Sequence, residues 1–203
     1  MTGISRGRRS RASWLCLVVA GATAVAACGG RARTRAAAEP SVAREIQLAE
    51  AVVLETSGPP PSDTVVEFVT GEPRVIVLRH GPPENVEFAE VSFPPRGFVG
   101  DSGHIVKVEV RPRPGVYGLD LITSLPLAQE AAVTFKYARY FSAPARARQV
   151  YGTDVAYERA LHVGQLIPNG QLLTLLPSTR PAADNLRGPV AAPGTYLVAA
   201  PVK

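Results

Sequence analysis

The sequence predicts an all-β fold, an antiparallel two-sheet β-sandwich over residues 63–203, preceded by a signal peptide and a flexible tether. Short apolar runs alternate with turns rich in proline, glycine and asparagine, which is the pattern of antiparallel sandwiches. Nineteen prolines disfavour long helices over most of the chain. No helical run of the length that a parallel crossover needs separates the strands, so a doubly wound fold is not expected.

Nine runs have the length and composition of strands. In chain order they are residues 64–70, 75–78, 86–93, 105–111, 116–122, 131–137, 155–163, 172–176 and 195–200. The run at 105–111 alternates most cleanly, with three valines on one face and charged residues on the other. The pattern of 86–93 changes phase, which predicts a bulge near Ala89. Asn169-Gly170 predicts a hairpin turn before the strand at 172–176, because both residues accept positive φ.

The N-terminus has the three parts of a secretory signal. Four arginines and no acidic residue precede an apolar run that begins at Trp14 and ends in small residues. The run has about 15 residues, short of the roughly 20 that span a bilayer. Its end, Val25-Ala26-Ala27-Cys28, is an aliphatic residue, two small residues and a cysteine, and it resembles the lipobox of bacterial lipoproteins.

The lipobox resemblance implies removal of residues 1–27 and attachment of diacylglycerol to the thiol of Cys28. The new amine would then receive a fatty acid such as palmitate. Several acyl chains make a stable anchor where one is marginal, so the resemblance implies a bacterial cell-envelope protein held in membrane lipid. Gly29 follows the cysteine, which in bacteria with two membranes is compatible with the outer membrane. The alternative is an ordinary signal peptide that contains a cysteine by chance.

Residues 28–62 are expected to form the lipidated N-terminus and a tether. Gly29-Gly30, a stretch of arginine and alanine, and Pro59-Pro60-Pro61 are poor material for a core. Apolar residues interrupt the tether at 41–55. Their spacing fits a short helix or a first strand, and the sequence leaves the two open.

The charge balance excludes a nucleic-acid-binding face. The whole chain carries a formal net charge of +5, but all 17 acidic residues and only 18 of the 22 basic ones lie beyond Cys28. The exported part is therefore almost neutral. Cys16 lies in the leader, so no disulfide or cysteine zinc site is expected after export. The three histidines, His80, His104 and His162, stand singly, and neither a metal nor another cofactor is expected.

Three stretches resemble ZU-five-type, immunoglobulin-like β-sandwich domains. Residues 90–98 form a strand followed by two prolines and a glycine. Residues 116–121 and 131–137 form an aromatic-glycine stretch and an alternating strand that ends in tyrosine. Residues 172–178 and 189–200 resemble the closing strands of such domains. The resemblance implies a module that binds or spaces other components, and it assigns no catalytic residue.

Two motifs suggest enzymatic alternatives. Residues 75–81, a buried-type strand that ends in Arg79-His80-Gly81, resemble the signature of histidine phosphatases. That resemblance implies His80 as the nucleophile and Arg79 as a phosphate clamp. The family also needs helices around a parallel sheet, which the downstream sequence does not predict. Residues 100–103, Gly-Asp-Ser-Gly, resemble the nucleophile loops of trypsin-like proteases and Gly-Asp-Ser lipases but are also ordinary turn residues.

The expected function is therefore that of a membrane-anchored, non-catalytic module that binds an envelope protein or spaces another component. Binding would use loops or an exposed sheet edge. A glycan-binding module is a further alternative. The only tryptophan lies in the leader, so a sugar would have to stack on tyrosines. The candidates are Tyr117, Tyr140, Tyr151 and Tyr157.

Overall fold

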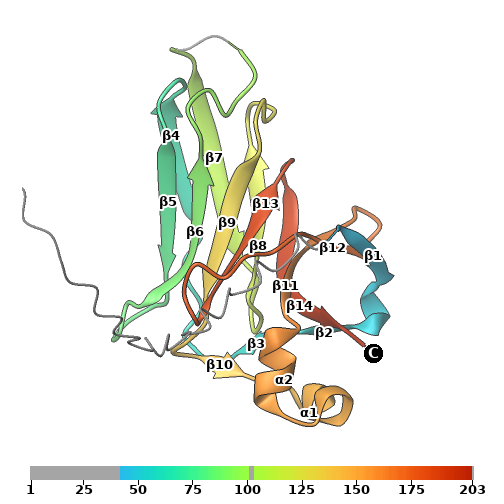
Figure 1. Ribbon diagram of the computed structural model, residues 1–203. Helices are drawn as coiled ribbons and strands as arrows, with labels where there is room; N and C mark the ends of the chain where they lie inside the picture. The colour runs from blue at the N-terminus through green and yellow to red at the C-terminus, as the bar shows by residue number, and fades with distance from the viewer. Residues whose placement is uncertain (1–41, 101–102, 203) are drawn as a thin grey trace, which may run out of the picture. The chain divides into compact units, whose positions relative to one another are not determined.

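The computed structural model describes residues 42–100 and 103–202. In these residues the chain forms antiparallel sheets that pack face to face, with two short helices at one end (Figure 1). The all-β sandwich predicted from the sequence is confirmed.

The larger sheet has eight strands, all paired antiparallel. Seven follow the order β1-β12-β11-β14-β8-β7-β4, and β2 pairs with β14 beyond the end of β8. The strands are β1 (Arg44–Gln47), β2 (Ala51–Val53), β4 (Thr64–Val69), β7 (Ile105–Pro112), β8 (Gly118–Thr123), β11 (His162–Leu166), β12 (Leu172–Leu175) and β14 (Gly194–Pro201).

The smaller sheet has four strands in the order β13-β9-β6-β5. They are β5 (Arg74–Arg79), β6 (Glu87–Phe93), β9 (Ala131–Lys136) and β13 (Asn185–Val190). A third sheet consists of two short strands that pair with each other. The remaining elements are β3 (Glu55–Thr56), β10 (Phe141–Ser142), the 3-10 turn η1 (Leu48–Glu50), α1 (Ala145–Tyr151) and α2 (Asp154–Arg159).

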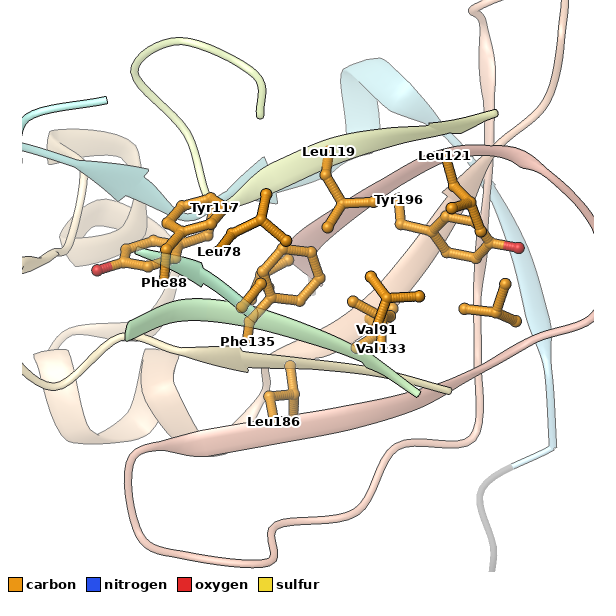
Figure 2. Packing of buried hydrophobic residues seen from close by; sticks show 14 of the residues in the cluster. Leu78, Phe88, Val91, Tyr117, Leu119, Leu121, Val133, Phe135, Leu186 and Tyr196 are labelled. Atoms are coloured by element: carbon orange, nitrogen blue, oxygen red, sulfur yellow. The ribbon is translucent and has the colours of Figure 1, made fainter. Parts of the chain in front are cut away.

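The main core lies between the inner faces of the two large sheets. Figure 2 shows Leu78, Phe88 and Phe135 of the smaller sheet facing Leu119 and Tyr196 of the larger one. The three valines of β7 are fully buried while its charged residues point outward, as the alternation predicts. Two inward faces that exclude water in this way are the main source of stability of a sandwich.

A second, smaller core lies on the opposite face of β14. Tyr196 and Val198 point into the main core, whereas Leu197 and Ala199 pack with residues of β1 and β12. β1 pairs with β12, β2 pairs with β14, and η1 joins β1 to β2, so this end of the larger sheet closes on itself (Figure 1). β14 is therefore buried on both faces, which explains its unbroken apolar run.

The segment at 41–55, for which the sequence left helix and strand open, forms strands. Residues 44–47 are β1, η1 turns the chain, and β2 and β3 follow. Ile46, Val52 and Leu54 are buried in the two cores. Residues 44–56, expected within the tether, thus join the sheets, because their apolar side chains find partners that lie far along the chain. The folded part begins well before residue 63.

The prediction of a strand at 155–163 is wrong for most of these residues. Asp154–Arg159 is the helix α2, and β11 begins only at His162. The hydroxyl of Thr153 accepts a hydrogen bond from the Ala156 amide at 3.1 Å, which caps the helix. The spacing of the apolar residues in this segment fits both a strand and a helix, and the Thr153 cap favours the helix.

The predicted hairpin turn connects β11 to β12. The amide of Gly170 donates to the Ile167 carbonyl at 2.8 Å, and Gly170 has a φ of 72°. Asn169 does not have positive φ; its side chain instead accepts from the Gln171 amide. The connection is therefore longer than a two-residue turn. The bulge predicted near Ala89 is confirmed by a register shift opposite Leu78 and Arg79.

The sequence does not predict strand β13, because Gly188 and Pro189 disfavour an interior strand. β13 is the end strand of the smaller sheet, and β9 is its strand partner. On its other side, among the described residues, Arg187 bridges to Thr179 but no further strand pairs, so the ladder tolerates a proline there. A Cβ on Gly188 would lie 2.6 Å from Cβ of Val163 on β11. The glycine thus lets the two sheets approach closely at this point.

Candidate functional site

The residues predicted for processing and lipidation, Val25, Ala26, Ala27 and Cys28, lie outside the described residues. Within residues 42–100 and 103–202, no helix is long and apolar enough to cross a membrane. The site candidates that the structure does place are His80, the tyrosines, the single histidines and the surfaces of the two sheets.

His80 is buried at the end of β5, with 1% of its surface exposed. Its Nδ1 lies 2.7 Å from the Pro59 carbonyl oxygen, so the ring N–H donates to the segment between β3 and β4. The rings of Phe88 and Tyr140 pack edge-on against it, at centroid distances of 5.2 Å and 4.6 Å. Nε2 is also buried and has no hydrogen-bond partner among the described residues. These contacts give His80 the role of fixing the 57–62 connection to the end of the sandwich.

Arg79 and His80 point to opposite sides of the smaller sheet, as successive strand residues do. The Arg79 guanidinium lies on the outer face and contacts the Glu87 carboxylate at 2.8 Å. The two side chains that a phosphatase would use together are therefore separated by the strand itself.

Most of the tyrosines suggested for sugar stacking are core residues. Tyr117, Tyr151 and Tyr157 are buried, and their hydroxyls donate to backbone carbonyls of Tyr137, Pro201 and Val52. Of the four, only Tyr140 is half-buried, near the surface. The structure does not bring these rings together into an exposed aromatic platform.

No group of three or more His, Cys, Asp or Glu side chains gathers in the part of the chain that the structure describes. His162 is half-buried in β11, and burial lowers its pKa. His104 is exposed, and Asp101 and Ser102 of the Gly-Asp-Ser-Gly motif lie outside the described residues.

A charged cluster beside His80 joins the β5–β6 connection to the β9–β10 connection. The Glu84 carboxylate accepts hydrogen bonds from Nε and Nη2 of Arg139. It also accepts one from the hydroxyl of Tyr140 at 3.1 Å. The hydrogen bond from Arg139 lowers the pKa of Glu84 to about 2. On the outer face of the smaller sheet, Lys136 likewise lies between Glu87 and Glu90 and lowers the pKa of Glu87.

The Glu84 cluster should make stability depend on acid. Because the pKa of Glu84 is lower in the folded chain than the ordinary value of 4.5, the ion pair stabilises the fold fully above pH 4.5. That stabilisation falls as the pH drops toward 2. We expect Glu84→Gln to lower the free energy of unfolding at pH 7 and to lessen its decline between pH 4.5 and 2. Urea unfolding at a series of pH values measures both. Equal pH slopes in the two proteins would contradict the assignment.

Exposed apolar side chains lie on the outer faces of both sheets, mainly near the edges formed by β4 and β5. In the described residues, six of the nine large apolar side chains that are exposed lie on β4, β5, β7 and β8. They are Val65, Val69, Val75, Val77, Ile105 and Ile122. Val69 lies opposite Ile105, and Glu109 lies between Val65 and Ile122 on neighbouring strands. The outer face of the larger sheet beside β4 therefore has apolar residues among charges, which is typical of protein contact sites.

The centre of this region is formed by β4 and β5, the end strands of the larger and the smaller sheet. Their outer edges have no strand partner in the described part of the chain, so backbone amides and carbonyls are left unpaired there. We call β4, β5 and their outward residues Val65, Glu67, Val69, Val75 and Val77 the edge surface. Residues of both strands also line a pocket of 240 Å³ at the turn between them.

An exposed sheet edge is one of the binding modes expected from the sequence, but the sequence does not show which strands form that edge. The sequence does mark this edge in one way: apolar residues stand at the outward positions of 64–70 and 75–78, where clean alternation would place polar residues.

No protein-family model, curated protein or solved structure matches this chain.

Proposed function

We propose that the chain is a lipid-anchored protein of the bacterial cell envelope, whose β-sandwich is a non-catalytic module that binds another protein. The anchor is the part of the proposal carried by Val25-Ala26-Ala27-Cys28 and the leader before it. The outer membrane is the proposed location in a bacterium with two membranes. The resemblance to ZU-five-type domains, which implies a binding or spacing module, agrees with this reading.

The observation that carries the binding role is the edge surface. Two end strands lie on the same side of the sandwich, and both present valines to solvent. β4 and β5 contain no proline and no bulge within the exposed part that would block pairing. An added strand can therefore form backbone hydrogen bonds to such an edge while its side chains contact the valines.

Photo-crosslinking in living cells tests the binding role. A photoreactive phenylalanine analogue replaces Val75 in the full-length chain, expressed with its own leader. Val155 is the matched control, because it is equally exposed, at 55%, but lies on α2. We expect protein adducts from position 75 and few or none from position 155. Absence of adducts at both positions, or equal yields, would contradict the proposal.

A further inference from the structure

We propose that the edge surface binds a second copy of this chain, with β4 of each copy pairing antiparallel with β5 of the other. This inference rests on the binding role proposed above, but not on lipidation. It names the partner, which the binding role leaves open.

The arrangement of β4 and β5 suits such a pairing. They belong to different sheets, and residues 70–73 connect them directly, so they run in opposite directions (Figure 1). Near this turn the Arg74 guanidinium lies 5.4 Å from the ring centre of Phe68, which shows that the two strands lie close there. A twofold axis parallel to the strands would place β5 beside β4 of the second copy, and β4 beside its β5. Each sheet of one copy would then continue into the other sheet of its partner.

The charges favour this pairing over the two symmetrical ones. Asp63 and Glu67 lie just before and within β4, whereas β5 begins with Arg74 and ends with Arg79. Pairing β4 with a second β4 would bring carboxylates together, and pairing β5 with a second β5 would offer Arg79 no carboxylate of the other copy. Like charges across a strand pair are destabilising. Pairing β4 with β5 instead sets opposite charges beside each other.

The same side chains also have contacts within one copy. Arg79 contacts Glu87, and Glu67 lies opposite Lys107 on β7. The second copy would add a charge on the free side of each strand, extending these pairs across the contact. The exposed outer edges of β4 and β5 make such an extension possible.

Two registers keep outward residues opposite outward residues and pair five residues of each strand. One places Val69 opposite Val75 of the second copy, and the other places Val65 opposite Val77. A shift of one residue would oppose outward to inward side chains, which a sheet with one buried face disfavours. In both registers, outward valines of the two copies lie opposite each other and shield each other from water. The half-buried Val66 and Phe68, on the inward side of β4, would lie beside Ile76 and Leu78 of the second copy.

Disulfide crosslinking between two differently tagged full-length copies tests the pairing. One copy carries Val69→Cys and the other Val75→Cys; a second combination uses Val65→Cys with Val77→Cys. We expect one of these two combinations to give a mixed dimer on mild oxidation of the membranes. Val69→Cys with Val155→Cys is the matched control, and a pair with only Cys16 and Cys28 measures background. A stronger crosslink between two copies of Val75→Cys than in either combination would overturn the proposed pairing.

A charge in the contact gives a second test without cysteines. In co-isolation of the two tagged full-length copies, we expect Val75→Lys to weaken association about tenfold or more. Val155→Lys, at a position of equal exposure, should leave it unchanged. If wild-type copies do not co-isolate but position 75 still crosslinks to another protein, the second copy is the wrong partner while the binding role holds. If position 75 forms no adduct either, both proposals fail.

Discussion

Replacing Cys28 by alanine should remove the protein from the membrane fraction or leave its leader uncleaved. The lipid would be attached to the Cys28 thiol, so without it no acyl chain can hold the exported chain in the bilayer. Alkaline washing of membranes, followed by mass spectrometry of the N-terminal peptide, measures both effects. The wild-type peptide should begin at Cys28 and carry the mass of a diacylglycerol and a fatty acid.

Cys16→Ala is the matched control, because Cys16 is the only other cysteine and lies within the leader. It should be processed and anchored like the wild type. If the Cys28→Ala protein stays in alkaline-washed membranes with its leader removed, the lipobox interpretation is wrong. If the Cys28→Ala protein keeps both its leader and its membrane association, the apolar run of the leader holds it in the membrane in place of a lipid.

Phe88→Ala should destabilise the sandwich by about 3–5 kcal/mol, the range for a large aromatic side chain removed from a core. Phe88 is fully buried at the bulge of β6. Its ring stacks on Tyr117 at a centroid distance of 5.3 Å and meets Phe135 and His80 edge-on. Its loss would therefore open a cavity between the sheets and beside the His80 contact to Pro59.

Urea unfolding of residues 28–203, followed by far-UV circular dichroism, measures this loss. Phe88→Leu is the control: it keeps most of the apolar volume and should cost about 1 kcal/mol. Val75→Ala, at the exposed edge, should change the free energy of unfolding by less than about 0.5 kcal/mol. A Phe88→Ala effect as small as that of Val75→Ala would show that the sheets do not pack through Phe88.

The strands that could be predicted are those whose pattern is local. In β7 and β9, apolar and polar residues alternate, and the strands appear where they were expected. The bulge near Ala89 also leaves a local mark, because the pattern changes phase there. The strand expected at 155–163 failed because a short segment fits both periods, and the cap at Thr153 selects the helix.

Other elements depend on partners far away in the chain. Residues 44–56 look like part of a tether, yet Ile46 is buried because β12 and β14 supply the other side of its core. β13 contains Gly188 and Pro189, which argue against a strand until its position at the end of a sheet is known. His80 has the sequence context of a phosphatase motif, but its burial and its contact with Pro59 follow from packing alone.

The sequence by itself determined the all-β class, and it predicts the leader with its lipobox and the near-neutral part that follows, because each shows in composition or in short-range periodicity. The tertiary structure alone decided that β14 is buried on both faces and that β4 and β5 end their sheets on one side of the sandwich. The alternation of apolar and polar residues shows that a strand has one buried and one exposed face. Which strands lie at an edge depends on long-range pairing, and that pairing makes the outward valines of β4 and β5 a candidate binding surface.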